Sequence, residues 1–308
     1  MHRGLGVDDL TVVIGLRAHA GNPWVVDRIG LWADWYRPAP RLLLVDLGSA
    51  APFDQTIRDA AERVGAEVLR VEDEGVYSQA IARNLGFATV QTPLVFFTDI
   101  DCLAPRGFFH SLLAHADALG LDRCFDQVVS LPAYFLDSET SGSIERETDV
   151  ERRERRLARA FVDGVHAPKG DTVEFVDPFS NIFLCHRDFF SLTGGYEPAF
   201  RGRGSEDFEW MIRANLHSGH IPMPLHPMTD TGSANSPSFW GVRPWAGFRR
   251  LGEATALQAE LAGLRVAHLS HPRSRAQVWY AENDDRQSAA PLLHRHHPMR
   301  AVAAPIKP

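Results

Sequence analysis

Short apolar runs alternate with amphipathic segments along the first third of the chain. Four runs rich in branched apolar residues predict buried strands over residues 11–16, 41–46, 66–71 and 94–98. The stretches between them have apolar positions at helical spacing and predict helices over residues 24–36, 55–65 and 77–88. Strands that alternate with helices in this way form βαβ units. The pattern therefore predicts an α/β fold with a mainly parallel central sheet flanked by helices.

The second half of the chain is less regular. It predicts helices over residues 108–118 and 206–215, and strands over residues 128–135, 179–186 and 264–269. Residues 138–170 are rich in charge, with ERRERRLARA at their centre, and predict an exposed helix with a solvated face. Residues 221–250 are rich in Pro, Gly, Ser and Trp, which is typical of a long loop.

Composition narrows the class of protein. The chain has 308 residues and is 44% hydrophobic and 23% charged, which is typical of a globular protein. Its formal charge of -7 shows no excess of basic residues of the kind that nucleic-acid-binding proteins use. Its three cysteines form no CxxC pair, so we predict neither a disulfide scaffold nor a zinc knuckle. No signal peptide or membrane-spanning run is evident. We therefore expect a protein of the reducing cytoplasm, and contact with the inner face of a membrane stays open.

Three polar residues lie at or just past the ends of predicted strands. Arg17 follows the first strand, Asp46 ends the second and Asp99 follows the fourth. Ligands of open α/β sheets bind beyond the carboxyl ends of the strands. We therefore expect these three side chains to converge on one crevice.

The triplet Asp99-Ile100-Asp101 is the strongest chemical signal of the first half. Two carboxylates at positions i and i+2 of an extended chain point to the same side. They follow the apolar run LVFFT, where unpaired charge is costly, and a divalent cation would offset that cost and bridge to phosphate oxygens. The alternative is a solvent-facing turn that happens to contain two aspartates.

Two further segments carry candidate chemistry. Glu206 and Asp207 open the helix predicted after GGYEPAFRGRGS, where one carboxylate would act as a general base or would simply complement the helix dipole. His268 and His271 lie at and just beyond the last predicted strand. A neutral imidazole suits a borderline metal, although surface or core histidines satisfied by protein contacts are the alternative.

Together these segments resemble the GT-A glycosyltransferases, and within them the inverting family 2-like and family 7-like enzymes. Bacterial capsule glycosyltransferases, chondroitin-type polymerases and the β-1,4-galactosyltransferase catalytic domain are similar. The resemblance is carried by ARNLGFATVQTPLVFFTDIDC, by SNIFLCHRDFFSLTGGYEPAFRGRGSEDFEW, and by HLSHP followed by YAENDDR. It implies the GT-A fold over residues 1–287, with a donor-binding half near 1–105, an acceptor and catalytic half near 106–287, and a loosely ordered tail over 288–308.

The resemblance also implies a metal and its ligands. Asp101 would bind Mn²⁺ or Mg²⁺, with His271 as a second ligand and His268 as its alternate. Asp99 would contact the ribose or the metal. The substrate implied is a nucleotide-sugar, a UDP-linked hexose or N-acetylhexosamine.

On the nucleotide side, the resemblance assigns Arg17, Tyr77, Arg83 and Asn84 to the nucleotide-binding surface. Asp46 would read the edge of the base. The second strand ends VDLGS here, whereas the family pattern is VDDGS, so one nucleotide contact of the family is missing.

On the acceptor side, the resemblance makes Asp207 the catalytic base and Glu206 an acceptor-binding residue. The family aromatic that packs on the sugar or acceptor before the G-x-E-D segment is replaced by RGRGS, so we expect Arg203 to face an anionic group instead. Trp240, in the Pro- and Gly-rich loop, would stack on an acceptor sugar, and core packing at the loop base is the alternative.

The resulting hypothesis is an inverting, metal-dependent transfer to a hydroxyl of a glycan acceptor, lipid-linked or free, in the synthesis of a bacterial surface polysaccharide. Three alternatives stay open. A sugar nucleotidyltransferase would need a glycine-rich phosphate loop, and IGLRAHAGNPW is a poor one. A non-catalytic carbohydrate-binding relative would not need the acidic residues and histidines together. A retaining transferase would give a product with the opposite anomeric configuration.

Overall fold

The computed structural model describes residues 4–32, 36, 39–166, 172–178, 180–202, 204–230, 236, 238–241 and 245–272. A six-stranded sheet lies at its centre, in the order β3-β2-β1-β4-β9-β6. The four strands from β3 to β4 are parallel, and β9 and β6 add an antiparallel edge. The strands are β1 Leu10–Leu16, β2 Arg41–Leu47, β3 Glu67–Val71, β4 Leu94–Thr98, β6 Val128–Ser130 and β9 Phe183–His186. The predicted α/β fold is confirmed.

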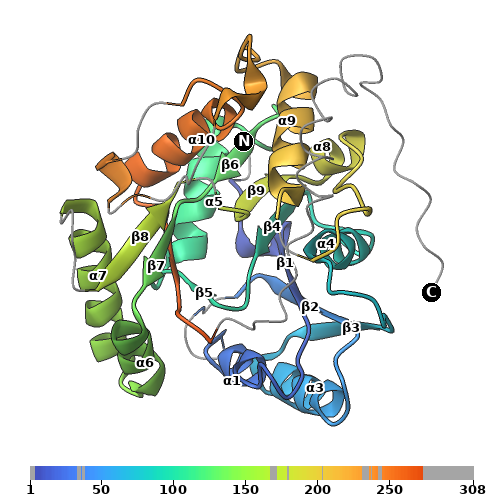
Figure 1. The fold of residues 1–308 in the computed structure, drawn as a ribbon, viewed down its shortest axis with the longest axis vertical. Helices are drawn as coiled ribbons and strands as arrows, with labels where there is room; N and C mark the ends of the chain where they lie inside the picture. Colours follow the sequence, from blue (N-terminus) through green and yellow to red (C-terminus); the bar gives the residue numbers. More distant parts are fainter. Residues whose placement is uncertain are drawn as a thin grey trace.

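Helices cover both faces of this sheet (Figure 1). One apolar cluster joins one face of β1 to α1, α3 and α5, and a second joins its other face to α4, α8 and α9. This arrangement explains why β1 is buried on both faces and has no polar alternation. The helices are α1 Trp24–Gly30, α3 Phe53–Val64, α4 Gln79–Phe87, α5 Phe108–Leu119, α8 Arg187–Leu192 and α9 Glu206–Ser218.

A second sheet of four strands, in the order β5-β10-β7-β8, lies beside the first. Its strands are β5 Cys102–Leu103, β7 Ala133–Leu136, β8 Val173–Asp177 and β10 Val266–His268. The prediction of a single strand over residues 128–135 is wrong, because this stretch forms two strands, β6 and β7, that belong to different sheets. The chain changes sheets at Pro132, whose carbonyl accepts a hydrogen bond from the backbone of Val266. Proline has no N–H for a sheet ladder, so a break at this position is favoured.

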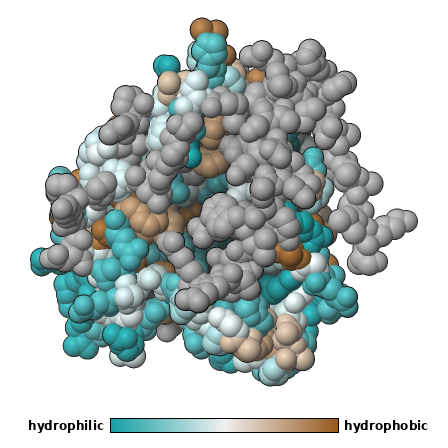
Figure 2. Space-filling model, viewed as in Figure 1, coloured by the Kyte–Doolittle hydropathy of each residue, from teal (hydrophilic) through white to brown (hydrophobic). Residues whose placement is uncertain are grey.

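The charged segment forms two helices, α6 Ser138–Arg146 and α7 Val150–His166. The predicted exposed helix is present, but α7 also has a buried stripe that includes Leu157 and Phe161. Arginines such as Arg155 and Arg159 lie on its solvent side. Figure 2 shows mainly hydrophilic side chains over this part of the surface. Helix α7 is therefore an amphipathic helix that covers the second sheet.

Four strands and helices were not predicted from the sequence: β5, β8, α8 and α10 Arg250–Leu261. Within the described part of residues 221–250, the chain forms a long loop, as predicted, with two short 3-10 helices, η2 Pro227–Thr229 and η3 Phe239–Gly241. A third, η1 Val7–Asp9, precedes β1. In the described part of the chain no helix has the length and apolar character that a membrane span requires. The predicted tail over residues 288–308 lies outside the described residues.

Candidate active site

Three side chains converge around the acidic triplet that follows β4. Oδ2 of Asp101 lies 3.3 Å from Nε2 of His268 and 3.3 Å from Nε2 of His271. Strand pairing explains the approach, because β10 runs antiparallel to β5 with His268 opposite Cys102. The backbone N–H of Leu269 also donates to the carbonyl of Asp101 at 2.8 Å. The segments that hold these residues are separated by more than 150 positions in the sequence and meet only in the folded chain.

The neighbours of Asp101 hold its carboxylate in the ionised form. Burial opposes ionisation of Asp101, but the neighbouring imidazoles of His268 and His271 outweigh it and hold the pKa of this carboxyl well below its usual range. The three ligand atoms lie within 4.8 Å of one another. One carboxylate oxygen and two imidazole nitrogens form a mixed donor set for a divalent first-row metal, in which the carboxylate is the ligand type that Mn²⁺ prefers. Of the two metals that the resemblance implies, the residues present fit Mn²⁺ better than Mg²⁺, which prefers oxygen ligands.

Asp99 faces a different set of partners. Its Oδ1 atom accepts hydrogen bonds from Nη2 of Arg83, at 2.8 Å, and from the side-chain amide of Gln79. Burial raises the pKa of Asp99, and the guanidinium of Arg83 acts in the opposite direction. The two carboxylates of the triplet thus have separate environments: imidazoles surround Asp101, and a guanidinium holds Asp99.

Arg83 joins the triplet to the start of α9. The side chain of Arg83 is fully buried, and its Nη1 atom donates to Oδ1 of Asn181 at 2.6 Å and to the hydroxyl of Tyr196 at 3.0 Å. The side-chain amide of Asn181 in turn lies 3.4 Å from Oε1 of Glu206. A continuous series of hydrogen-bonded polar side chains, here called the polar chain, therefore runs from Asp99 through Arg83 and Asn181 to Glu206. It connects the residue after β4 with the carboxylates of α9.

Glu206 and Asp207 open α9 from a strained turn. Ser205 precedes them with φ 72°, a left-handed conformation that non-glycine residues rarely adopt. Burial, followed by the charge of Glu206, raises the pKa of Asp207 to about 8, and burial likewise raises the pKa of Glu206. A carboxylate with a raised pKa at a pocket is well suited to accept a proton near neutral pH.

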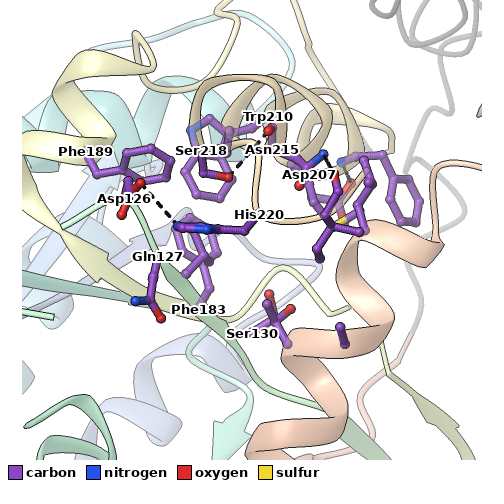
Figure 3. A pocket seen from close by; sticks show the side chains of 18 of the residues that line it. Asp126, Gln127, Ser130, Phe183, Phe189, Asp207, Trp210, Asn215, Ser218 and His220 are labelled. Carbon is purple, nitrogen blue, oxygen red and sulfur yellow. Dashed lines mark hydrogen bonds and ion pairs between the residues drawn. The ribbon is translucent and has the colours of Figure 1, made fainter. Parts of the chain in front are cut away.

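A cavity of about 390 Å³ extends from Asp207 along α9 (Figure 3). Apolar side chains, including Phe183 and Trp210, form much of its wall, and their rings are stacked with centroids 4.3 Å apart. At the far end His220 and Asp126 form an ion pair of 3.2 Å. The cavity therefore links the candidate base to an apolar, partly aromatic channel between α9, α10 and the β6 edge of the sheet.

The residues predicted on the nucleotide side lie near the carboxyl ends of β1 and β2. Arg17 donates to the carbonyls of Gly75, at 2.6 Å, and of Leu47, and its guanidinium lies 5.7 Å from the centroid of the Tyr77 ring. The hydroxyl of Tyr77 bonds to Gln79, which also holds Asp99. Arg17, Tyr77 and Asp99 are thus brought into one connected site.

Asp46 and Asn84 are both held by protein partners. Asp46 is buried, and its carboxylate accepts from Arg70 at 2.6 Å and from the backbone of Ser49 at 3.0 Å. Asn84 bonds to both the N–H and the carbonyl of Tyr196, at 2.9 and 2.7 Å. These contacts fix α4 and the end of β2, and the nucleotide roles of both residues stay predictions.

Two further residues, Arg203 before α9 and Trp240 after it, were predicted to bind the acceptor, and the structure says little about either role. Arg203 lies outside the described residues. Trp240 lies in η3 with 52% of its surface exposed, against the ring of Phe239. Its role in stacking on an acceptor stays a prediction.

Three residues of the polar chain were missed in the sequence: Gln79, Asn181 and Tyr196. Asn181 offered a signal, since it stands beside the apolar run IFLC at the start of a predicted strand. A polar side chain at such a position has to be satisfied by partners, and here these are Arg83 and Glu206.

Comparison with known proteins gives one family. The sequence profile of the family described as "Glycosyltransferase like family 2" matches residues 11–292. None of the curated proteins matches the chain.

Solved structures are similar at low identity. Glucosyl-3-phosphoglycerate synthase from Mycobacterium tuberculosis, in complex with Mn²⁺, UDP-glucose and phosphoglyceric acid, is 17% identical, with 71% of this chain and 72% of that chain covered and a TM-score of 0.38. A second crystal structure of the M. tuberculosis enzyme is 18% identical, with 68% and 67% covered and a TM-score of 0.37. The family profile spans nearly the whole sequence, and the protein therefore belongs to the glycosyltransferase-like family 2 and is a glycosyltransferase with the GT-A fold.

Proposed function

We propose that the protein transfers a hexose or N-acetylhexosamine from a UDP-sugar to a hydroxyl of a glycan acceptor, with a divalent metal and with inversion at the anomeric carbon. The observation that carries the proposal is the polar chain from Asp99 through Arg83 and Asn181 to Glu206. It joins a candidate metal site to a carboxylate pair with raised pKa values, which are the two components that such a transfer needs.

The donor would lie at the carboxyl ends of β1, β2 and β4. Asp101, His268 and His271 would hold Mn²⁺ or Mg²⁺, which when bound supplies charge neutralisation for the leaving diphosphate. Asp99, fixed by Arg83, faces the same region and would contact the ribose or the metal. Arg17 and Tyr77 would border the nucleotide.

Asp207 would act as the general base. It would take the proton of the acceptor hydroxyl as that oxygen forms a bond to the anomeric carbon and the bond to the diphosphate breaks. A single displacement of this kind inverts the anomeric configuration. Glu206, bonded to Asn181, would orient the acceptor next to this base.

The cavity beside Asp207 supports an uncharged acceptor. Among the lining residues that the structure describes, Asp126, His220 and Asp207 are the titratable ones, and two of these are acidic. The described lining includes no arginine or lysine that would pair with an anionic acceptor, and Asp126 is already paired with His220. An uncharged acceptor is therefore favoured. We propose a neutral glycan, lipid-linked or free, of the kind used in bacterial surface polysaccharide synthesis.

A thermal-shift screen of UDP- and GDP-sugars, each with and without Mn²⁺, tests the donor and metal assignments. A ligand that binds the native state raises its melting temperature, so we expect a shift that needs both the UDP-sugar and Mn²⁺. The absence of any metal-dependent shift across the screen would contradict the metal assignment.

The active donor is then incubated with neutral glycosides and with their phosphorylated counterparts, and products are analysed by NMR. We expect transfer to the neutral acceptors and an anomeric configuration opposite to that of the donor. Retention would identify a retaining transferase, and binding without turnover a non-catalytic relative. Conversion of the nucleotide-sugar and added pyrophosphate to a nucleoside triphosphate and a sugar 1-phosphate would identify a nucleotidyltransferase.

A further inference from the structure

Each histidine beside Asp101 stacks on an aromatic ring from a different part of the chain. The ring of His271 lies parallel to Trp24 of α1, with centroids 4.3 Å apart and an interplanar angle of 20°. The ring of His268 stacks on Phe135 of β7 at 4.1 Å and 21°. The two imidazoles are thus held from separate elements, while both direct Nε2 toward the same oxygen of Asp101.

The support behind each ring is itself fixed. Phe135 stacks on Phe175 of β8, with centroids 4.2 Å apart. Behind Trp24, the guanidinium of Arg28 lies 4.4 Å from the indole centroid, and the Arg28 side chain is almost fully buried. A buried cation over an indole ring restricts the movement of both groups.

Arg28 also fixes the backbone between the two histidines. Its Nη2 atom donates to the carbonyl of Ser270 at 2.6 Å, and its Nη1 atom donates to the carbonyl of Leu269 at 3.2 Å. Its Nε atom pairs with Glu145 at 2.7 Å. One side chain of α1 therefore anchors the segment that carries His271 and supports the ring on which His271 stacks.

The orientation of His271 is compatible with metal binding. Its Nδ1 atom lies 3.2 Å from the carbonyl oxygen of Pro272. With a metal bound at Nε2, the proton of the imidazole would stand on Nδ1, where that carbonyl would accept it in a hydrogen bond.

We propose that Trp24 and Phe135 are positioning residues that hold His271 and His268 as simultaneous ligands of one divalent metal, together with Asp101. Because both rings are restrained before the metal arrives, neither histidine is a mere alternate of the other. Groups that orient metal ligands in this way typically change metal affinity about 10- to 100-fold when removed. This inference rests on the metal site of the proposed function.

Mn²⁺ binding to the full chain, without nucleotide or acceptor, tests the proposal. Affinity is measured by calorimetry, and the number of imidazole nitrogens coupled to Mn²⁺ is measured by electron spin-echo spectroscopy. We expect two coupled nitrogens in the wild type. Trp24→Leu, which removes the ring but keeps an apolar side chain, should weaken binding about tenfold or more and lose one coupled nitrogen.

Matched variants distinguish a loss of ligand positioning from a loss of folding. Trp24→Phe keeps an aromatic face and should retain two coupled nitrogens, and Asp27→Ala, at an exposed position of the same helix, should behave as the wild type. Phe135→Leu should likewise lose one nitrogen, and the double variant Trp24→Leu/Phe135→Leu should lose both. Metal-free melting temperatures show that each variant is folded before its metal binding is compared.

Two outcomes overturn the proposal in distinguishable ways. If the wild type binds Mn²⁺ through two nitrogens and Trp24→Leu and Phe135→Leu leave affinity and nitrogen count unchanged, the stacked rings do not position the ligands. If the wild type binds no Mn²⁺, or His271→Ala binds it as well as the wild type does, the metal site of the proposed function is wrong and the inference fails with it.

Discussion

The Nη2 atom of Arg83 lies 2.8 Å from Oδ1 of Asp99, and this ion pair joins the middle of α4 to the residue that follows β4. The Arg83 side chain has no exposed surface, whereas about a third of the Asp99 side chain, 36%, is exposed. The guanidinium therefore forms the buried base of the site, and the carboxylate forms part of its surface.

Replacing Arg83 should destabilise the fold strongly. Arg83→Met keeps the length of the side chain but leaves Asn181, Tyr196 and Asp99 without their common donor. Leaving a buried acceptor without its donor typically costs about 1–3 kcal/mol of unfolding free energy, which urea denaturation measures. Arg58→Met, in the exposed pair with Asp54 on α3, is the control and should cost about 1 kcal/mol or less. A loss at Arg83 no larger than at Arg58 would show that the buried network contributes little.

Asp207→Asn should remove most turnover while donor binding stays close to that of the wild type. The amide keeps the size of the side chain but accepts no proton, and a general base typically contributes about 10²- to 10⁴-fold to the rate. Turnover is measured by release of the nucleoside diphosphate, and donor affinity by calorimetry. Glu62→Gln, exposed on α3, is the matched amide control and should retain wild-type rates. Wild-type turnover in Asp207→Asn would exclude this residue as the base.

The same carboxyl should set the pH dependence of the reaction. Burial and the charge of Glu206 raise the pKa of Asp207 to about 8, so the active, ionised base forms only as the pH rises through that value. We expect kcat/KM to increase from pH 6 toward a plateau above about pH 8. A rate that is flat over this range, measured with the metal concentration held constant, would contradict the assignment.

Stability should change in the opposite direction with pH. The folded-state pKa of Asp207 is raised from 3.8 to about 8, so this group favours the folded state at low pH, and that contribution is lost as the pH rises through 8. In metal-free buffer, Asp207→Asn should therefore gain stability over the wild type, with a larger gain at pH 9 than at pH 5. An equal difference in melting temperature at both values would mean that Asp207 is not the group that titrates.

Close packing of α4 on the sheet predicts an effect of a single methyl group. A Cβ atom at Gly86 would lie 2.6 Å from Val13 and 2.7 Å from Val45, closer than side chains tolerate. Gly86→Ala should therefore destabilise the protein by about 1–3 kcal/mol, as overpacked cores do. At Gly30, in α1, a Cβ would meet no atom within 4 Å, so Gly30→Ala should be neutral or stabilising. Denaturant unfolding of the two variants compares them, and equal stabilities would mean that α4 shifts to accept the methyl group.

The pattern of apolar and polar residues was enough to predict the first βαβ half of the fold. Strand β4 begins and ends where its apolar run does, because a strand buried on both faces needs apolar residues at every position. It also indicated the acidic triplet, the carboxylates of α9 and the two histidines as candidates, since charged or ionisable groups next to apolar runs require partners. The short strands of the second sheet were harder to predict, because β6 and β7 are contiguous apolar runs whose separation depends on which sheet each one joins.

Which of these candidate residues lie side by side depends on the long-range packing of the folded chain. Local periodicity carries no information on which distant strands pair, so the sequence linked His268 to Asp101 only through the family resemblance, and the pairing of β10 with β5 that brings them together is seen only in the folded chain. The stacking of Trp24 on His271 likewise depends on long-range packing, and so do the partners of Asn181, because Arg83 and Glu206 lie on either side of it. The triplet thus has two separate environments, a carboxylate between two imidazoles at Asp101 and a guanidinium-held one at Asp99, because long-range packing placed different partners beside each.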